Sequence, residues 1–148
     1  MSKSDVITEE NRATAQAPDA YFYLGRFLED CHRIQSHRFQ SREEMDCRLD
    51  RLVVQYFGSL EEDGMLQHDI NRYYHGILTD LKRDYPRFTR KMILLFSYTA
   101  ARLPRSLICA WAHISSEGAV SSLRSRMKNH IFYRIRGRRE EYLDLLSR

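Results

Sequence analysis

The sequence lacks the features that would assign it to a membrane or secreted class. No run approaches the roughly 18 apolar residues of a membrane-spanning helix, and the first twenty residues have no apolar centre of the kind found in signal peptides. Only three prolines and six glycines occur in 148 residues, and runs of valine or threonine are few. These absences favour a helical, cytoplasmic chain without a membrane segment. A fragment of a longer, membrane-anchored regulator would have the same features.

Motifs for catalysis and metal binding are also missing. The six histidines form no H-E-x-x-H arrangement and the cysteines form no C-x-x-C pair, so we expect no metal site. Cys31, Cys47 and Cys109 are interpreted as reduced core or boundary residues. There is no nucleophile elbow, phosphate-binding loop or dinucleotide glycine motif. We therefore expect neither an enzyme nor a cofactor.

Charge is distributed unevenly along the chain. Residues 86–148 contain thirteen lysines and arginines and four acids, a net charge of +9, whereas residues 1–85 carry a net charge of −5. Between Ala119 and Gly137 the sequence contains no acid. Segregation of this kind is typical of a protein whose basic part binds a polyanion.

Apolar periodicity predicts an all-α fold whose first part is an arm of about three helices. Residues 1–18 are polar and aperiodic and are interpreted as a disordered tail. The acidic arm covers residues 19–85, a coupling or dimerisation region. Its helices are predicted over residues 20–38, 41–57 and 60–85, the last being one long helix that Pro86 ends.

The basic region 86–148 is predicted to hold three short helices and a fourth at the chain end. Their approximate ranges are 87–101, 105–113, 117–133 and 140–148. In the third helix a narrow apolar stripe is formed by Val120, Leu123, Met127 and Ile131. Trp111 is interpreted as a core anchor on the inner side of the second helix. The apolar fourth helix must dock, either against a second copy or back on the chain's own arm.

The run Arg124-Ser125-Arg126-Met127-Lys128, followed by Ile131, is similar to the K-S-R-L-K run of a known helix-turn-helix variant. Residues 88–131 resemble the LuxR-type (GerE-like) helix-turn-helix, in the form that ends certain tetratricopeptide-linked bacterial transcriptional regulators. The Ile108-Cys109 pair and the Ser115-Ser116 turn also correspond. The chain departs from the family at Ala101-Arg102-Leu103-Pro104, where the family usually has glycine, a hydrophobic residue and serine.

The resemblance implies a DNA-binding transcriptional regulator, or the cytoplasmic output fragment of one. Double-stranded DNA is the expected partner, with the helix near residues 117–133 in the major groove. By their angle from the apolar stripe, the base-facing residues are Ser122, Ser125 and Asn129, flanked by Ser121 and Arg126. Phosphate contacts are assigned to the cations Arg124, Lys128, Arg102, Arg105, Arg134 and Arg136. One such module reads little sequence alone, so a homodimer on spaced half-sites is expected, with a sensor domain or partner protein upstream.

A second reading of the same pattern belongs to a different class. The chain would be a helical protein-interaction or signal-coupling module that keeps a helix-turn-helix fold and no longer binds DNA. Its working surface would be the acidic residues 20–85. The missing glycine near Ala101-Arg102 is the observation that favours this alternative.

Overall fold

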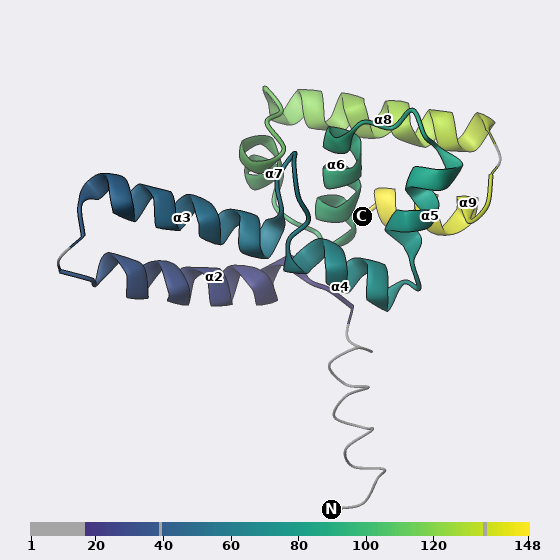
Figure 1. Cartoon of the computed structure of the whole chain (residues 1–148). Helices are drawn as coiled ribbons and strands as arrows, with labels where there is room; N and C mark the ends of the chain where they lie inside the picture. Colours follow the sequence, from purple (N-terminus) through teal and green to yellow (C-terminus); the bar gives the residue numbers. More distant parts are fainter. Residues whose placement is uncertain (1–16, 39, 135) are drawn as a thin grey trace, which may run out of the picture.

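The structure is a computed structural model that describes residues 17–38, 40–134 and 136–148 (Figure 1). Its described part is all-α and has no strand, which confirms the predicted fold class. The predicted tail, residues 1–18, lies outside the described residues apart from Ala17 and Pro18. Among the described helices, none is both long and apolar enough to cross a membrane. The helices are α2 (Ala20–Gln35), α3 (Arg42–Phe57), α4 (Met65–Tyr73), α5 (Ile77–Asp84), α6 (Arg90–Ala100), α7 (Arg105–Trp111), α8 (Glu117–Tyr133) and α9 (Arg139–Leu146).

Helices α2 and α3 form an antiparallel hairpin that projects from the rest of the molecule (Figure 1). Both begin at side-chain N-caps. The side chain of Asp19 accepts a hydrogen bond from the amide of Tyr21 at 2.8 Å, and that of Ser41 accepts one from the amide of Glu44 at 3.1 Å. The hairpin is attached at its base, where the amide of Ala20 donates to the carbonyl of Ala101 at 2.8 Å.

The prediction of one helix over residues 60–85 is wrong. The segment before Met65 is a loop, and the remainder is divided into α4 and α5 at Tyr74 to Gly76. His75 and Gly76 both have positive φ angles, 53° and 79°, and the Gly76 amide donates to the carbonyl of Asn71. This is the hydrogen-bond pattern of a Schellman helix end. The chain therefore turns sharply here, although its apolar stripe continues on both sides.

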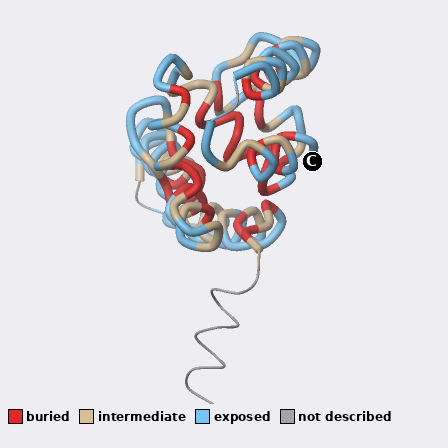
Figure 2. The backbone as a smooth tube through the Cα atoms, turned by 90° about the vertical axis from the view of Figure 1, so that its right-hand side faces the viewer, coloured by how far each residue is buried: buried red, intermediate tan, exposed pale blue. Residues whose placement is uncertain are grey.

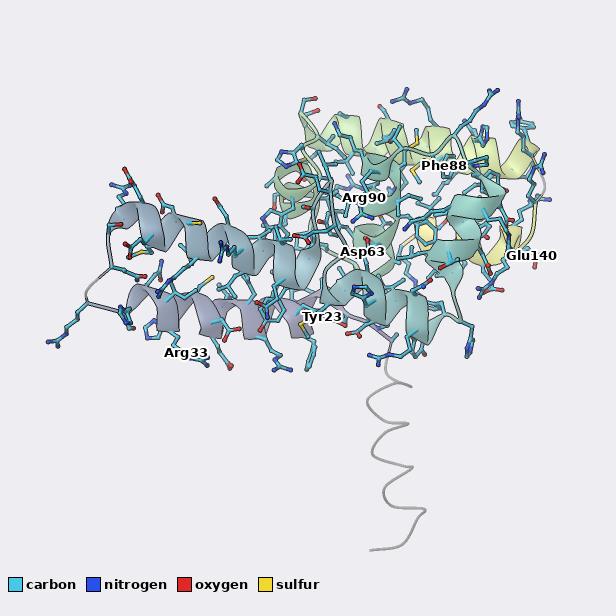
Figure 3. All side chains as sticks on the ribbon, viewed as in Figure 1. Tyr23, Arg33, Asp63, Phe88, Arg90 and Glu140 are labelled. Carbon is cyan, nitrogen blue, oxygen red and sulfur yellow. The ribbon has the colours of Figure 1, made fainter. Side chains whose placement is uncertain are left out.

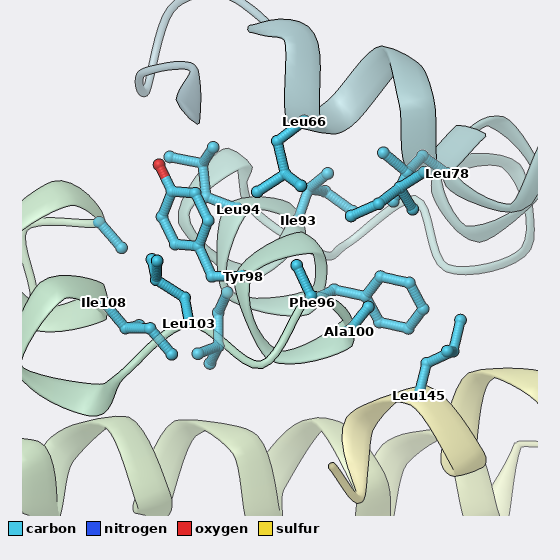
Figure 4. Packing of buried hydrophobic residues seen from close by; sticks show 14 of the residues in the cluster. Leu66, Leu78, Ile93, Leu94, Phe96, Tyr98, Ala100, Leu103, Ile108 and Leu145 are labelled. Carbon is cyan, nitrogen blue, oxygen red and sulfur yellow. The ribbon is translucent and has the colours of Figure 1, made fainter. Parts of the chain in front are cut away.

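Helix α6 is the centre of the core, because all eight residues from Ile93 to Ala100 are buried. Its side chains meet α4 and α5 on one side and α7, α8 and α9 on the others (Figure 4). Buried segments gather in the interior of the body, whereas the outer turns are exposed (Figure 2). Leu66, Leu78 and Leu145 reach α6 from three different helices. Helices of the arm and helices of the basic region therefore share one core around α6.

A buried polar network fixes the end of α3 against α4 and α6. The Gln67 side chain, 1 % exposed, accepts from the Gly64 amide at 2.7 Å and donates to the Phe57 carbonyl at 2.9 Å and the Ser97 hydroxyl at 3.1 Å. The Tyr98 hydroxyl donates to the same Phe57 carbonyl at 2.7 Å. Buried polar atoms need such partners, so this network holds the hairpin at a defined angle.

The C-terminal helix α9 docks on its own chain. Tyr142, Leu145 and Leu146 are buried against α6 and α8. The Tyr142 hydroxyl donates to Asp84 at 2.7 Å, which ties α9 to the end of α5. The sequence left open docking on a second copy or on the chain's own arm. The apolar face is instead buried chiefly against α6 and α8, which belong to the basic region.

Candidate nucleic-acid interface

Helix α8 has the bounds that the sequence predicts, Glu117–Tyr133. It begins where the Ser116 hydroxyl accepts from the Ala119 amide at 3.0 Å, and Glu117 places a carboxylate in the first turn, where the helix dipole favours it. The four residues of the predicted stripe are buried against α6, α7 and α9. The opposite side of the helix therefore faces outward along one edge of the molecule (Figure 1).

The outward side of α8 carries the residues assigned to base reading. Ser122, Ser125, Arg126 and Asn129 are exposed, and Ser121 is half-buried at the edge of the stripe. We call these five residues the reading face. Figure 3 shows nitrogen-tipped side chains projecting from α8 away from the body.

The cations assigned to phosphates flank the reading face. Arg124 and Lys128 are half-buried along α8, whereas Arg102, Arg105, Arg134 and Arg136 are exposed. Arg102 and Arg105 lie at the α6–α7 break, and Arg134 and Arg136 follow the end of α8. The structure thus places the assigned cations on α8 and near both of its ends.

None of these eleven side chains forms an ion pair with a carboxylate of the described residues. The paired cations lie elsewhere. Arg90 contacts Asp63 at 2.6 Å, Arg72 contacts Asp69 at 2.6 Å, and Arg138 contacts Asp80 at 3.2 Å. The arginines that are paired with carboxylates of the chain therefore lie on other surfaces than the reading face and its flanking cations.

The break between α6 and α7 is a tight turn that contains no glycine. Arg102 adopts a φ of 62°, in the left-handed region that glycine occupies most easily. Its amide donates to the Thr99 carbonyl and the Leu103 amide to the Tyr98 carbonyl, so α6 ends in a Schellman motif. Leu103 is buried, and Pro104 caps α7. Arginine thus stands in a glycine-like conformation.

A pocket of about 280 Å³ opens beside this turn, against the first half of α8. We call it the arginine pocket. Its lining includes four arginines and no acid: Thr99, Arg102, Leu103, Pro104, Arg105, Ile108, Val120, Arg124 and Arg148. The sequence analysis missed Thr99 and Arg148, because only the fold brings α6 and the end of the chain to this position.

A second, smaller pocket of about 170 Å³ lies at the other end of α8. Its lining is also rich in cations: Arg83, Asp84, Tyr85, Pro86, Arg87, His130, Arg134 and Arg136. The Tyr85 hydroxyl donates to the carbonyl of Arg134 at 2.8 Å and so holds the end of α8 in place. Burial raises the pKa of Tyr85 above its ordinary value.

Two further interpretations of single residues need correction. Trp111 is half-buried, and its ring stacks on Phe57 at 4.4 Å and meets Phe27 edge-on at 5.8 Å, so it joins α7 to the hairpin. Its place in the amphipathic pattern could not reveal a partner more than fifty residues away. Cys47 is exposed on α3 and lies outside the core and its boundary, whereas Cys31 and Cys109 are half-buried as expected.

Within the described residues, no group of three or more His, Cys, Asp or Glu side chains is arranged to hold a metal ion. No family model matches the chain, and neither the curated proteins nor the solved structures gave a match.

Proposed function

We propose that this chain is a DNA-binding transcriptional regulator, or the output portion of one, which lays α8 in the major groove of duplex DNA. The observation that carries the proposal is the surface of α8. It is rich in serine and arginine, it faces outward, and its cations have no carboxylate partner among the described residues. Unpaired cations around a polar helix face are suited to phosphates and base edges.

The spacing of the flanking cations supports the same proposal. Arg124 and Arg134 are ten positions apart, which corresponds to about 15 Å along a helix axis. Arg124 lies at the middle of α8 and Arg134 directly after its end, so these two cations could contact phosphates that are well separated along the DNA backbone. The LuxR-like arrangement of α6, α7 and α8 and the pairing of two copies on spaced half-sites belong to this proposal.

Binding to duplex DNA at increasing salt concentration tests the function. Fluorescence anisotropy of a labelled duplex should give a dissociation constant that rises steeply with salt, with a slope of about 0.9 for each phosphate contact. An Arg124→Ala/Lys128→Ala variant should lose most of the affinity and about two units of slope. Salt-independent binding, or none, would contradict the proposal.

A matched control removes the same charge elsewhere. Arg33→Ala/Arg72→Ala deletes two largely exposed arginines, one on the hairpin and one on α4. This variant should bind DNA like the unmodified chain. If both double variants lose affinity equally, the effect reflects net charge, and α8 has no special role.

The hairpin favours a second candidate function, a protein-interaction module. Tyr21, Phe22 and Leu28 of α2 are 69, 57 and 62 % exposed, which is unusual for large apolar side chains on one projecting helix. Light scattering of the chain alone and with duplex DNA separates the two functions. A complex that forms only when DNA is present supports the regulator. Self-association that is independent of DNA and is abolished by Leu28→Gln supports the interaction module.

A further inference from the structure

The arginine pocket is a concentrated positive site for its size. Arg102, Arg105, Arg124 and Arg148 are among the residues that line it, and the lining includes no Asp or Glu of the described residues. The side-chain carboxylate paired with one of these arginines is that of Asp144, which lies 4.0 Å from Arg148 and is 77 % exposed. Four arginines around a cavity of about 280 Å³ make it favourable for an anion.

One of the four cations is already held in position. The Arg148 guanidinium donates to the carbonyl of Ala100 and to the hydroxyl of Tyr74, each at 3.2 Å. These bonds fix it at the C-terminal end of α6, and its side chain is only 23 % exposed. Because the guanidinium is already held by these two hydrogen bonds, ordering it when an anion binds costs little conformational entropy.

Thr99, in the wall of the pocket, is buried and has a side-chain hydroxyl without a hydrogen-bond partner among the described residues. The residue is 4 % exposed, and the unpaired atom is its Oγ1. A buried hydroxyl without a partner costs free energy. Thr99 is one of the residues that line the pocket, and a rotation of its side chain would let the hydroxyl donate to an anion seated there.

We propose that the arginine pocket is a binding site for a single phosphate group, with Arg124, Arg148 and Thr99 as its principal ligands. A guanidinium suits phosphate because it donates two parallel hydrogen bonds to phosphate oxygens. The phosphate can belong to a DNA backbone or be free in solution. In the first case the inference deepens the proposed function and rests on it, and in the second it stands alone.

Inorganic phosphate added to the full chain tests the site directly. A titration followed by ¹H–¹⁵N NMR, at constant ionic strength, should give saturable shifts of the amides of Arg102, Leu103 and Val120. Arg124→Gln should weaken phosphate binding about tenfold, because a charge-assisted hydrogen bond is lost. Thr99→Val, which keeps the volume and removes the hydroxyl, should weaken it severalfold. Arg33→Gln, on the hairpin and outside the pocket, should leave it unchanged.

The result that overturns the inference is the absence of saturable shifts at these amides. Equal effects of Arg124→Gln and Arg33→Gln would overturn it as well. Circular dichroism of each variant excludes loss of the fold.

Duplex DNA added to the phosphate-saturated chain identifies the source of the group. Displacement of phosphate by the duplex assigns the pocket to a backbone phosphate. Phosphate that stays bound when the duplex is added assigns the pocket to a free phosphate. Phosphate binding without any DNA binding supports the pocket and contradicts the proposed function, so the two ideas fail separately.

Discussion

The rings of Phe57 and Trp111 stack at 4.4 Å between centroids, and this contact joins the end of the α2–α3 hairpin to α7. Helix α7 in turn packs against α8, so the stack lies between the projecting hairpin and the proposed DNA-reading helix. The Phe57 carbonyl is also held by Gln67 and Tyr98. A rigid connection of this kind keeps the hairpin and α8 in a fixed relation.

Trp111→Ala tests this connection. It should lower the free energy of unfolding by about 2–3 kcal/mol, since both aromatic burial and the stacking contribution are lost. Urea unfolding measures this change in free energy. Circular dichroism is the suitable signal, because the substitution removes the only tryptophan and with it the tryptophan fluorescence. Trp111→Phe should recover part of the loss. Two variants as stable as the unmodified chain would show that the stack contributes nothing.

Two glycines should respond in opposite ways to the same substitution. A Cβ on Gly64 would lie 2.4 Å from the Gly58 amide nitrogen and 2.5 Å from the Val54 carbonyl, both backbone atoms. Gly64→Ala should therefore destabilise by about 2 kcal/mol or more. Gly25 in α2 has nothing within 4 Å of an added Cβ, and Gly25→Ala should stabilise by roughly 0.5–1 kcal/mol. Thermal unfolding compares them, and equal shifts would be inconsistent with this packing.

Arg102 should reveal a conflict between stability and binding. Arg102→Gly relieves the left-handed conformation and should raise the free energy of unfolding by about 0.5–1 kcal/mol, after the entropy of glycine in the unfolded chain is subtracted. Arg102→Ala keeps the strain and removes the same cation. Both variants should lower the salt slope of DNA binding by about one unit. A glycine variant less stable than the alanine variant would be evidence against the strain.

Asn129 should affect which sequences bind and leave the electrostatic part of binding unchanged. An amide side chain reads adenine in the major groove, and one such contact is worth about 1–3 kcal/mol of discrimination. Asn129→Ala should relax the preference among duplexes selected from a random pool and leave the salt slope intact. The matched variant Arg136→Ala should lower the slope and preserve the preference. The reverse result would show that Asn129 contacts the DNA backbone and does not read bases.

Alkaline pH should destabilise the fold through its buried tyrosines. Burial, strengthened by the carboxylates of Asp69 and Asp84, raises the pKa of Tyr23 and of Tyr142 well above the usual value, and burial does the same for Tyr98. Each folded-state pKa is raised, so these contributions are complete below about pH 10 and are lost as the pH rises further. Chemical denaturation at pH 9, 10 and 11 should show falling stability.

Tyr142→Phe provides the control for the alkaline prediction. It removes one ionisable group, so the decline above pH 10 should be shallower than in the unmodified chain, although the variant is less stable at neutral pH. A stability that stays constant to pH 11 would rule out the buried tyrosines as its cause.

Much of α8 could be predicted from the sequence because several local signals agree. Ser116 as a cap, the spacing of Val120, Leu123, Met127 and Ile131, and the polar residues between them all specify the same helix. The error at residues 60–85 has a local cause as well. The stripe continues through the break, and the deciding residue, His75, is a left-handed residue that is not glycine.

The arginine pocket could not be predicted, because its parts are distant in the chain. Arg148 and the Ala100 carbonyl are 48 residues apart, and no spacing rule connects them. In the sequence Thr99 is an ordinary residue of an apolar helix, and its unpaired hydroxyl among the described residues is a property of the fold alone. The cations could be assigned to phosphates in general, whereas the pocket that gathers them depends on the packing of α6, α7, α8 and α9.

The docking of α9 limits how two copies could meet. With Tyr142, Leu145 and Leu146 turned inward, the outer side of this helix presents Glu140, Glu141 and Asp144. Glu141 is paired with Arg138 and Asp144 lies 4.0 Å from Arg148, so a twofold contact through this side of α9 would join charged surfaces, not apolar ones. Two copies side by side on a duplex would therefore be aligned in one of two ways. The spacing of their binding sites on the DNA would set their separation, or the exposed apolar side chains of the hairpin would form the contact between them.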